Sequence, residues 1–497
     1  MGRGLQEDEA GEIEHRADAL FALPRIPRSA TLFDAGLGWA RDLQKRQIEV
    51  QPAGGRGRPD VAIAGPAGIE AALASRAETI VVDGPRGARA ALRDTGRTTT
   101  RLLPLPVAGT PVLFVNVEQR RAARYGVEHG IVHPERWRTL RNRIARLALG
   151  AGVVPPVRQL VTLAAPSPGP PVFLAAARDL GSDPGSSWVM LVSAGSVVRR
   201  NAFLLFPPGS SAPEQVLKFA RVPAMTEPFD RDERGAKLVA SAGGLLAARA
   251  PQYLGRFEVD GHSASIESAA VGTKLAILLR RPGSREAKLA HLEPVARWLI
   301  DVAAETASPP KSLEPERARL QAEVLPFWAR EGAPPDLLDR LPAVQATFQH
   351  FDVAEENIVA GRGTFAVLDW EWAKPQGLPL SDLVYFGVHV LRIVDGAQSE
   401  AERDRHFADV MAGRAPGSPV LFGWIRDGMA ALGLPPEAMG PLVTLQWLER
   451  GHLSRQERQR AEEVGGTPLG KPFAERAARI WLEDPALGPG WDAWRRS

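Results

Sequence analysis

The stretch FQHFDVAEENIVAGRGTFAVLDWEWA, residues 348–373, contains the strongest motif in the chain. Its first half fits the pattern H-x-D-x-x-x-x-N, which begins at His350, and a β-type run, FAVLD, closes its second half. Phosphoryl transfer needs a carboxylate to orient the attacking hydroxyl, and a carboxylate with an amide oxygen to hold magnesium on the phosphates. The side chains here that meet this need are Asp352, Asn357 and Asp369.

The spacing inside this stretch predicts a hairpin. Gly361 and Gly363 stand between two β-type runs and indicate a short turn. We therefore expect Asn357 and Asp369 to lie at the same end of the hairpin. The alternative is that His350 caps a core helix and the acids are solvated surface. The chain has only nine histidines, so one at this spacing before a strand ending in LDW favours the catalytic interpretation.

The segment resembles the catalytic and metal-binding loops of the aminoglycoside phosphotransferase and choline kinase group, a branch of the protein-kinase-like fold. The resemblance implies ATP and Mg²⁺ as cofactors. It departs at Phe351, where the family usually has a small residue, often glycine. The roles that it implies are catalytic for Asp352 (the base) and His350, magnesium binding for Asn357 and Asp369, and a structural acid at Asp382 in PLSDLVYF.

A kinase-like N-lobe should supply a lysine for the nucleotide phosphates and an acid that holds it. Lys218 lies inside the apolar alternating run QVLKFARV, and Glu233 lies on an expected helix, DERGAKLVASAGGLLA. The resemblance makes them an ion pair, with Glu227 as the second choice. The alternatives are a lysine that protects an edge strand and an exposed helical glutamate.

Two further segments are expected to contact the nucleotide. VMLVSAGSVVRRNAFLLF has a turn at Gly195 and Ser196 whose backbone amides would cover the phosphates, although a plain β-hairpin fits its single glycine as well. SASIESAAVGTKLAILL resembles the strand and hinge between lobes. The backbone near Glu267 to Ala269 would then bind adenine.

The rest of the chain predicts an α+β protein: a protein-kinase-like bilobal domain, with a β-rich N-lobe and a helical C-lobe, preceded by a small α/β domain. Proline- and glycine-rich stretches near 165 and 181 indicate the boundary, so a fragment from residue 183 should fold alone. The expected ranges are 1–30 for a flexible tail, 31–165 for an α/β domain of unknown role, 183–270 for the N-lobe and 271–497 for the C-lobe.

Strands beginning near Asp60, Thr79 and Pro111 alternate with helices in the α/β domain, which argues for parallel strands. FDAGLGWARDL has Gly36 and Gly38 but lacks the third glycine of a dinucleotide fingerprint. It does not clearly follow a strand either, so we interpret it as a turn.

Composition limits the partners and the compartment. Lys+Arg total 61 against 58 for Asp+Glu, without a long block of like charge, which argues against a nucleic-acid partner. No cysteine is present, which excludes disulfides and thiolate metal sites. The polar, acidic start lacks the pattern of a signal peptide, and no apolar run reaches about 18 residues. We expect a cytoplasmic protein without a membrane partner; the oligomeric state is left open.

The expected reaction is transfer of the ATP γ-phosphate to a hydroxyl of a small molecule: a sugar, an aminocyclitol or an amino alcohol. Glu371, Glu355 and Glu356 are candidates for contact with a cationic acceptor. Two alternatives stand beside this reading. One is a catalytically silent kinase-like protein that binds nucleotide and regulates or scaffolds a partner; the other places a transferase activity in the first domain.

Overall fold

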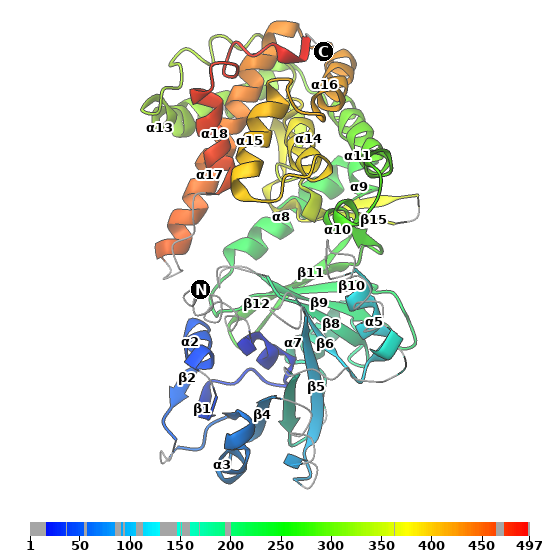
Figure 1. Cartoon of the computed structure of the whole chain (residues 1–497), viewed down its shortest axis with the longest axis vertical. Helices are drawn as coiled ribbons and strands as arrows, with labels where there is room; N and C mark the ends of the chain where they lie inside the picture. The colour runs from blue at the N-terminus through cyan, green and yellow to red at the C-terminus, as the bar shows by residue number, and fades with distance from the viewer. Residues whose placement is uncertain are drawn as a thin grey trace, which may run out of the picture. The chain divides into compact units, whose positions relative to one another are not determined.

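The computed structural model divides the chain into two compact units (Figure 1). Unit 1 comprises Met1–Asp230 and Gln252–Val271, and unit 2 comprises Arg231–Pro251 and Gly272–Ser497. Each unit is described by itself. The described residues are 16–35, 37–53, 57–84, 91–92, 95–105, 113–129, 147–149, 151, 160–167, 169–193, 200–361, 363–463 and 472–495.

Unit 1 is built on a 12-stranded sheet in the order β11-β12-β10-β9-β8-β6-β5-β7-β4-β3-β1-β2. The four strands at the β2 end are parallel, and every pairing from β4–β7 onward is antiparallel. The strands are β1 (Ser29–Phe33), β2 (Glu49–Gln51), β3 (Val61–Ala64), β4 (Thr79–Gly84), β5 (Thr98–Leu105), β6 (Leu113–Asn116), β7 (Leu160–Ala165), β8 (Ser187–Leu191), β9 (Asn201–Phe206), β10 (Gln215–Phe219), β11 (Tyr253–Val259) and β12 (His262–Ser268).

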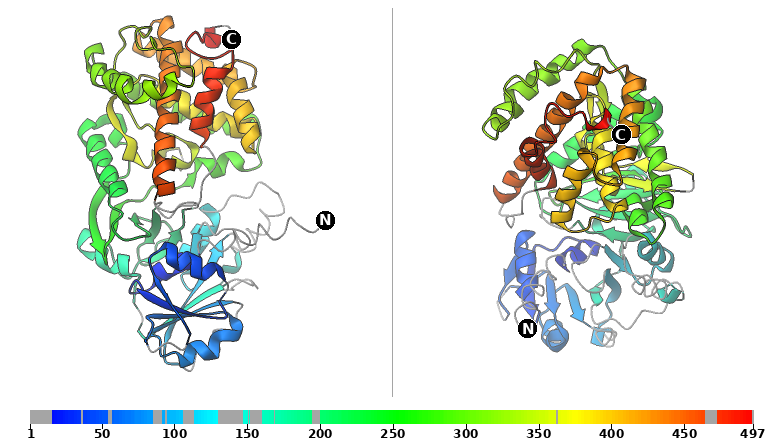
Figure 2. Two further views of the ribbon diagram at one scale, coloured as in Figure 1. Left: turned by 90° about the vertical axis from the view of Figure 1, so that its left-hand side faces the viewer. Right: turned by 45° about the horizontal axis from the view of Figure 1, so that its top comes forward.

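Helices cover both faces of the parallel strands (Figure 2). Strands β3 and β4 are apolar and buried on both sides, as the sequence of a covered parallel sheet requires. One face packs against α2 (Leu37–Lys45) through Trp39, and the other against α3 (Ile69–Ala74) through Ala72. The remaining helices and short helical turns are η1 (Arg16–Ala22), η2 (Pro66–Gly68), α5 (Arg120–His129), α7 (Val172–Ala176) and η3 (Ala177–Leu180).

The sheet runs across the boundary that we expected between an α/β domain at 31–165 and an N-lobe at 183–270. β6 pairs with β8 through Val115 and Val189, so strands from both ranges share one sheet. The proline- and glycine-rich segment between them is a packed connection, because Phe173 and Leu174 of α7 are fully buried. The boundary that we predicted between residues 165 and 183 therefore does not separate two domains, whereas the one predicted at 270/271 lies within one residue of the unit boundary at Val271 and Gly272.

Two local expectations for the start of the chain were also wrong. Residues 16–30 are not a flexible tail, since η1 is buried and β1 begins at Ser29; residues 1–15 lie outside the described part. FDAGLGWARDL does follow a strand, because β1 ends at Phe33 and α2 begins at Leu37. The strands expected near Asp60 and Thr79 are present as β3 and β4.

Unit 2 is mostly helical, with one large hydrophobic core and two small sheets, β13-β15-β16 and β14-β17. The long α8 (Glu227–Ala242) begins in unit 1 and continues into unit 2. The other elements are α9 (Gly244–Ala247), β13 (Thr273–Lys274), α10 (Leu275–Arg280), α11 (Arg285–Glu305), η4 (Pro310–Leu313), α12 (Glu314–Arg319), η5 (Leu320–Val324), α13 (Leu325–Ala329), β14 (Thr347–Gln349), η6 (Glu355–Asn357), β15 (Ile358–Ala360), β16 (Phe365–Val367), η7 (Trp370–Trp372), β17 (Lys374–Gly377), α14 (Ser381–Val394), α15 (Glu400–Met411), α16 (Ser418–Leu432), η8 (Pro436–Ala438), α17 (Met439–Glu463), α18 (Phe473–Glu483) and η9 (Ala493–Arg495).

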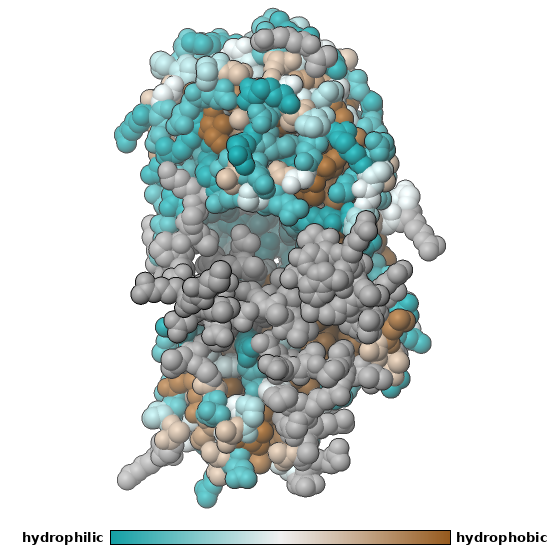
Figure 3. All heavy atoms as spheres, in the orientation of Figure 1, coloured by the Kyte–Doolittle hydropathy of each residue, from teal (hydrophilic) through white to brown (hydrophobic). Residues whose placement is uncertain are grey.

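The mixed α+β composition agrees with the predicted class. In the view of Figure 3 the surface of unit 2 is mostly hydrophilic, with apolar side chains in small groups. Among the described residues, no helix combines the length and the apolar character needed to cross a membrane.

Candidate functional site in unit 2

The loop after β14 holds Asp352 and Asn357 against each other. The Nδ2 atom of Asn357 donates to Oδ2 of Asp352 at 2.8 Å and to its backbone oxygen at 2.9 Å. The loop closes through η6, which ends at Asn357. The two side chains that the motif singled out are therefore in direct contact.

A hairpin brings Asp369 to the same place. β15 and β16 pair with Ile358 opposite Val367, and the amide of Leu368 donates to the oxygen of Asn357 at 2.8 Å. Asn357 directly precedes β15, and one residue, Leu368, separates the end of β16 from Asp369. The predicted hairpin is confirmed, and with it the expectation that both residues lie at one end of it.

His350 is almost fully buried, and the backbone engages both of its ring nitrogens. Its Nε2 donates to the oxygen of Leu368 at 2.7 Å, while its Nδ1 accepts from the amide of Asp352 at 3.1 Å. Burial lowers the pKa of His350, which keeps the ring neutral in this tautomer. These contacts join the two loops, so His350 positions them. They do not support the catalytic role that we expected of it.

Asp382, in the first turn of α14, anchors the backbone of the loop after β14, as expected of a structural acid. Its carboxylate accepts from the amides of His350 at 2.6 Å and Phe351 at 3.0 Å. It also accepts from Arg450 of α17 at 3.2 Å, and the same guanidinium donates to the backbone oxygen of Phe351. Arg450 was missed from the sequence, where one arginine in a helical run gives no signal.

Phe351 fits the position that is usually small because its backbone and its ring both have partners. Its φ of 69° is left-handed, a conformation that favours glycine. Its ring is buried between Arg450 and Lys374, whose cationic groups lie 4.3 and 4.2 Å from the ring centroid. Cation–π contacts of this kind offset part of the backbone strain. The departure from the family pattern therefore leaves the loop formed.

The carboxylate of Asp352 has a raised pKa, so it can take up a proton near neutral pH. Burial raises the pKa of Asp352 to about 7; Arg450 opposes this rise and the nearby charge of Asp369 adds to it. Hydrogen bonds from Tyr385 and Asn357 to the carboxylate also lower that pKa. A general base is most effective when its pKa lies near the working pH.

The donor set at the end of the hairpin fits magnesium. Asn357 uses its amide nitrogen for Asp352, which leaves its amide oxygen for a cation, and Asp369 adds a carboxylate. No group of three or more His, Cys, Asp or Glu side chains within the described part of the chain is placed to hold a metal. Mg²⁺ ordinarily takes one or two protein oxygens and completes its shell with water and phosphate, so this small set is sufficient.

The residues expected to contact the nucleotide lie partly in unit 1. Lys218 of β10 is buried, and its ammonium lies 3.2 Å from the carboxylate of Glu267 on β12. Glu233, on the part of α8 that belongs to unit 2, pairs with Lys237 at 2.6 Å. The pair between Lys218 and Glu233 stays a prediction. The alternative acid, Glu227, begins α8.

The proposed adenine contacts are not supported. The backbone of Glu267 lies in β12, which pairs with strands on both sides. The amide of Ala269 donates to the oxygen of Glu214 at 2.8 Å, because the pairing with β10 continues past the end of the strand. Gly195 and Ser196 lie outside the described residues.

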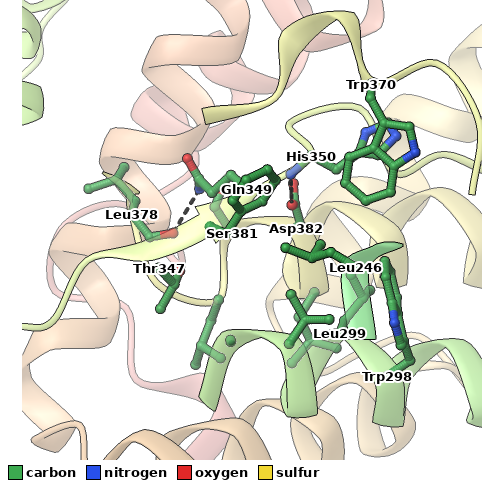
Figure 4. A pocket seen from close by; sticks show the side chains of 15 residues that line it. Leu246, Trp298, Leu299, Thr347, Gln349, His350, Trp370, Leu378, Ser381 and Asp382 are labelled. Atoms are coloured by element: carbon green, nitrogen blue, oxygen red, sulfur yellow. Dashed lines mark hydrogen bonds between the residues drawn. The ribbon is translucent and has the colours of Figure 1, made fainter. Parts of the chain in front are cut away.

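A small cavity in unit 2 is lined in part by Gln349 and His350, next to the loop that holds Asp352 (Figure 4). Its volume is about 20 Å³, which is room for one water molecule and not for a nucleotide. Trp298 and Leu299 of α11 line one side, and His350 and Asp382 line the other. Ser381 places a buried hydroxyl there that has no hydrogen-bond partner in the described part of the chain. The cavity is therefore lined by residues that hold the loop in place, and it is too small to be a substrate site.

Comparisons with known proteins gave distant structural likenesses. No family model and no curated protein matches the chain. It is similar to a structure from Ralstonia eutropha assigned provisionally as an aminoglycoside phosphotransferase, at 15% identity and a TM-score of 0.37, covering 65% of this chain and 97% of that one. A glucosamine kinase gives 16% identity, a TM-score of 0.34, and coverage of 63% and 85%. The bifunctional kinase-methyltransferase WbdD gives 13% identity and a TM-score of 0.29, with coverage of 90% of this chain and 93% of that one. All three TM-scores lie below 0.5, and none of these likenesses establishes a function for this chain.

Proposed function

We propose that the protein is an ATP- and Mg²⁺-dependent phosphotransferase that acts on a hydroxyl of a small molecule. The single observation that carries the proposal is the contact of Asp352 with Asn357 at the end of a hairpin that also presents Asp369. A base and two oxygen ligands for a divalent cation are the parts that phosphoryl transfer requires of a protein.

In this proposal the residues of unit 2 have separate roles in metal binding, proton transfer and support of the loop. Mg²⁺ would be held by the amide oxygen of Asn357 and the carboxylate of Asp369, and when bound it neutralises charge on the phosphates. Asp352 accepts the proton of the acceptor hydroxyl as that oxygen bonds to the γ-phosphorus and the bond to the bridging oxygen breaks. Asp382 and Arg450 keep the loop in shape through the backbone of Phe351.

The acceptor class is a hydroxyl compound such as a sugar, an aminocyclitol or an amino alcohol. The acids that we considered for a cationic acceptor already have basic partners: Glu355 pairs with Arg392, Glu356 with Arg280, and Glu371 with Arg231. Neutralised carboxylates attract a cation less, so these pairs favour testing neutral sugars first.

The test is ATP consumption by the purified full chain across a panel of sugars, aminocyclitols and amino alcohols, with Mg²⁺ and with EDTA. We expect turnover that depends on both one acceptor and Mg²⁺, and that is lost in Asp352→Asn. ATP binding without turnover on any acceptor would contradict the proposal and favour a silent nucleotide-binding protein.

A further inference from the structure

Both oxygens of the Asp352 carboxylate receive a hydrogen bond, and the two donors come from different elements. The hydroxyl of Tyr385, on α14, donates to Oδ1 at 3.2 Å. The amide of Asn357, at the end of η6, donates to Oδ2 at 2.8 Å. Two donors on opposite oxygens restrain the rotation of the carboxylate about its own bond, which one donor would leave open.

Tyr385 is itself held in place. The guanidinium of Arg450 lies 3.6 Å from the centroid of its ring, and the ring of His389 lies 4.2 Å away. Arg450 also bonds Asp382 and the backbone of Phe351, so one cation fixes both the ring and the loop that carries Asp352. Burial raises the pKa of Tyr385 well above its usual value, so its hydroxyl keeps its proton and donates.

We propose that Tyr385 is a positioning residue of the site, whose hydroxyl aims the Asp352 carboxylate at the acceptor hydroxyl. The role rests on the proposed function, whereas the contact does not. A carboxylate oxygen has two lone pairs, so Oδ1 can accept from Tyr385 and still take the acceptor proton. The acceptor oxygen then bonds to the γ-phosphorus, the bond to the bridging oxygen breaks, and ADP leaves.

The contact is tested without any activity measurement. The chain has three tyrosines, so ¹³C label at the ring carbon that bears the hydroxyl gives three NMR signals. We expect the signal of Tyr385, identified by its loss in Tyr385→Phe, to shift in Asp352→Ala, while those of Tyr125 and Tyr253 stay in place. A Tyr385 signal that does not move in folded Asp352→Ala would overturn the contact and the role together.

The role is tested by Tyr385→Phe, which removes one hydroxyl and keeps the ring contacts. A catalytic group that is misplaced by about 1 Å can lose about 10²-fold in rate, so we expect the loss of this restraint to lower kcat about tenfold or more. The KM for ATP should stay within about twofold, because the hydroxyl acts on the base. Tyr125→Phe, on α5 of unit 1, is the matched control and should keep full kcat.

The other outcomes are also decisive. Full kcat in Tyr385→Phe, or parallel changes in kcat and in the KM for ATP together with a lower melting temperature, would overturn the positioning role. A wild-type protein that shows no turnover with any acceptor would overturn the proposed function and this role, and the NMR result would still stand by itself.

Discussion

Arg221 and Asp18 form a fully buried two-point ion pair across 203 residues of unit 1. Nη2 of Arg221 donates to Oδ2 of Asp18 at 2.9 Å, and its Nε donates to Oδ1 at 3.2 Å. Arg46, directly after α2, bonds the same carboxylate at 2.9 Å and also pairs with Asp42 of α2. Arg221 stands three residues after Lys218, so this cluster joins η1, which contains Asp18, to the strand that carries the proposed phosphate ligand.

Asp18→Ala should lower the free energy of unfolding by about 3–5 kcal/mol, because two buried guanidinium groups would then share one carboxylate. The measurement is chemical denaturation of the full chain. Glu78→Ala is the control, since it breaks the exposed pair with Arg25 and should cost at most about 1 kcal/mol. Equal losses in the two variants would contradict the buried cluster.

A fragment that begins at residue 183 should not fold by itself, contrary to what the proline-rich segment suggested. It lacks β6, the neighbour of β8, and it lacks Asp18, the partner of Arg221. An exposed β8 edge and an unpaired buried cation each favour aggregation or unfolding. Near-ultraviolet circular dichroism and gel filtration measure this. A soluble fragment with native tertiary signal would show that the sheet is divisible here.

Two conservative substitutions should separate binding from turnover at the proposed site. Asp369→Asn should weaken Mg²⁺-dependent nucleotide binding, because a hard cation loses one charged oxygen. Asp352→Asn should leave that binding nearly intact and lower turnover by about 10²–10⁴-fold, as removal of a general base does. Calorimetric titration and steady-state kinetics give the two readings. The same response from both variants would contradict the separate roles.

The partner of Lys218 can be decided by two double-mutant cycles measured on ATP affinity. Glu267→Gln should be non-additive with Lys218→Ala, since their side chains form a 3.2 Å pair on one face of the sheet. Glu233→Gln in the second cycle tests the pair that the sequence predicts, because the Glu233 carboxylate also has a contact with Lys237. Coupling in the Glu233 cycle and none in the Glu267 cycle would identify Glu233 as the partner of Lys218, as the sequence predicts.

Turnover should rise with pH through about 7. Asp352 must be unprotonated to accept the hydroxyl proton, and burial raises its pKa to about 7, so kcat/KM should fall about tenfold for each unit below that value. Since the charge of Asp369 contributes to the raised pKa, saturating Mg²⁺ should move the acidic limb of kcat to lower pH. A flat profile between about pH 6 and 8 would argue against Asp352 as the base.

The parts that the sequence predicted well are those in which neighbouring residues determine the geometry. The hairpin follows from two glycines between β-type runs, and its length alone brings Asn357 and Asp369 to one end. Arg450, Tyr385 and the pair of Asp18 with Arg221 could not be predicted, because each depends on which distant segments pack together. The same limit explains the wrong boundary: the proline-rich stretch looks like a linker until the pairing of β6 with β8 is known.

The path of the chain between the two units has a consequence for synthesis on the ribosome. Strands β11 and β12, which follow α8 and α9 in the chain, form one edge of the sheet of unit 1. The sheet therefore cannot be complete until residue 268 has left the exit tunnel. By then residues 231–251 are joined at both ends to unit 1, although they belong to unit 2 and pack against elements that have not yet left the tunnel. Leu246 and Val239 are in the core of unit 2. A nascent chain paused at this point would expose these two side chains, and transiently exposed apolar surface favours aggregation.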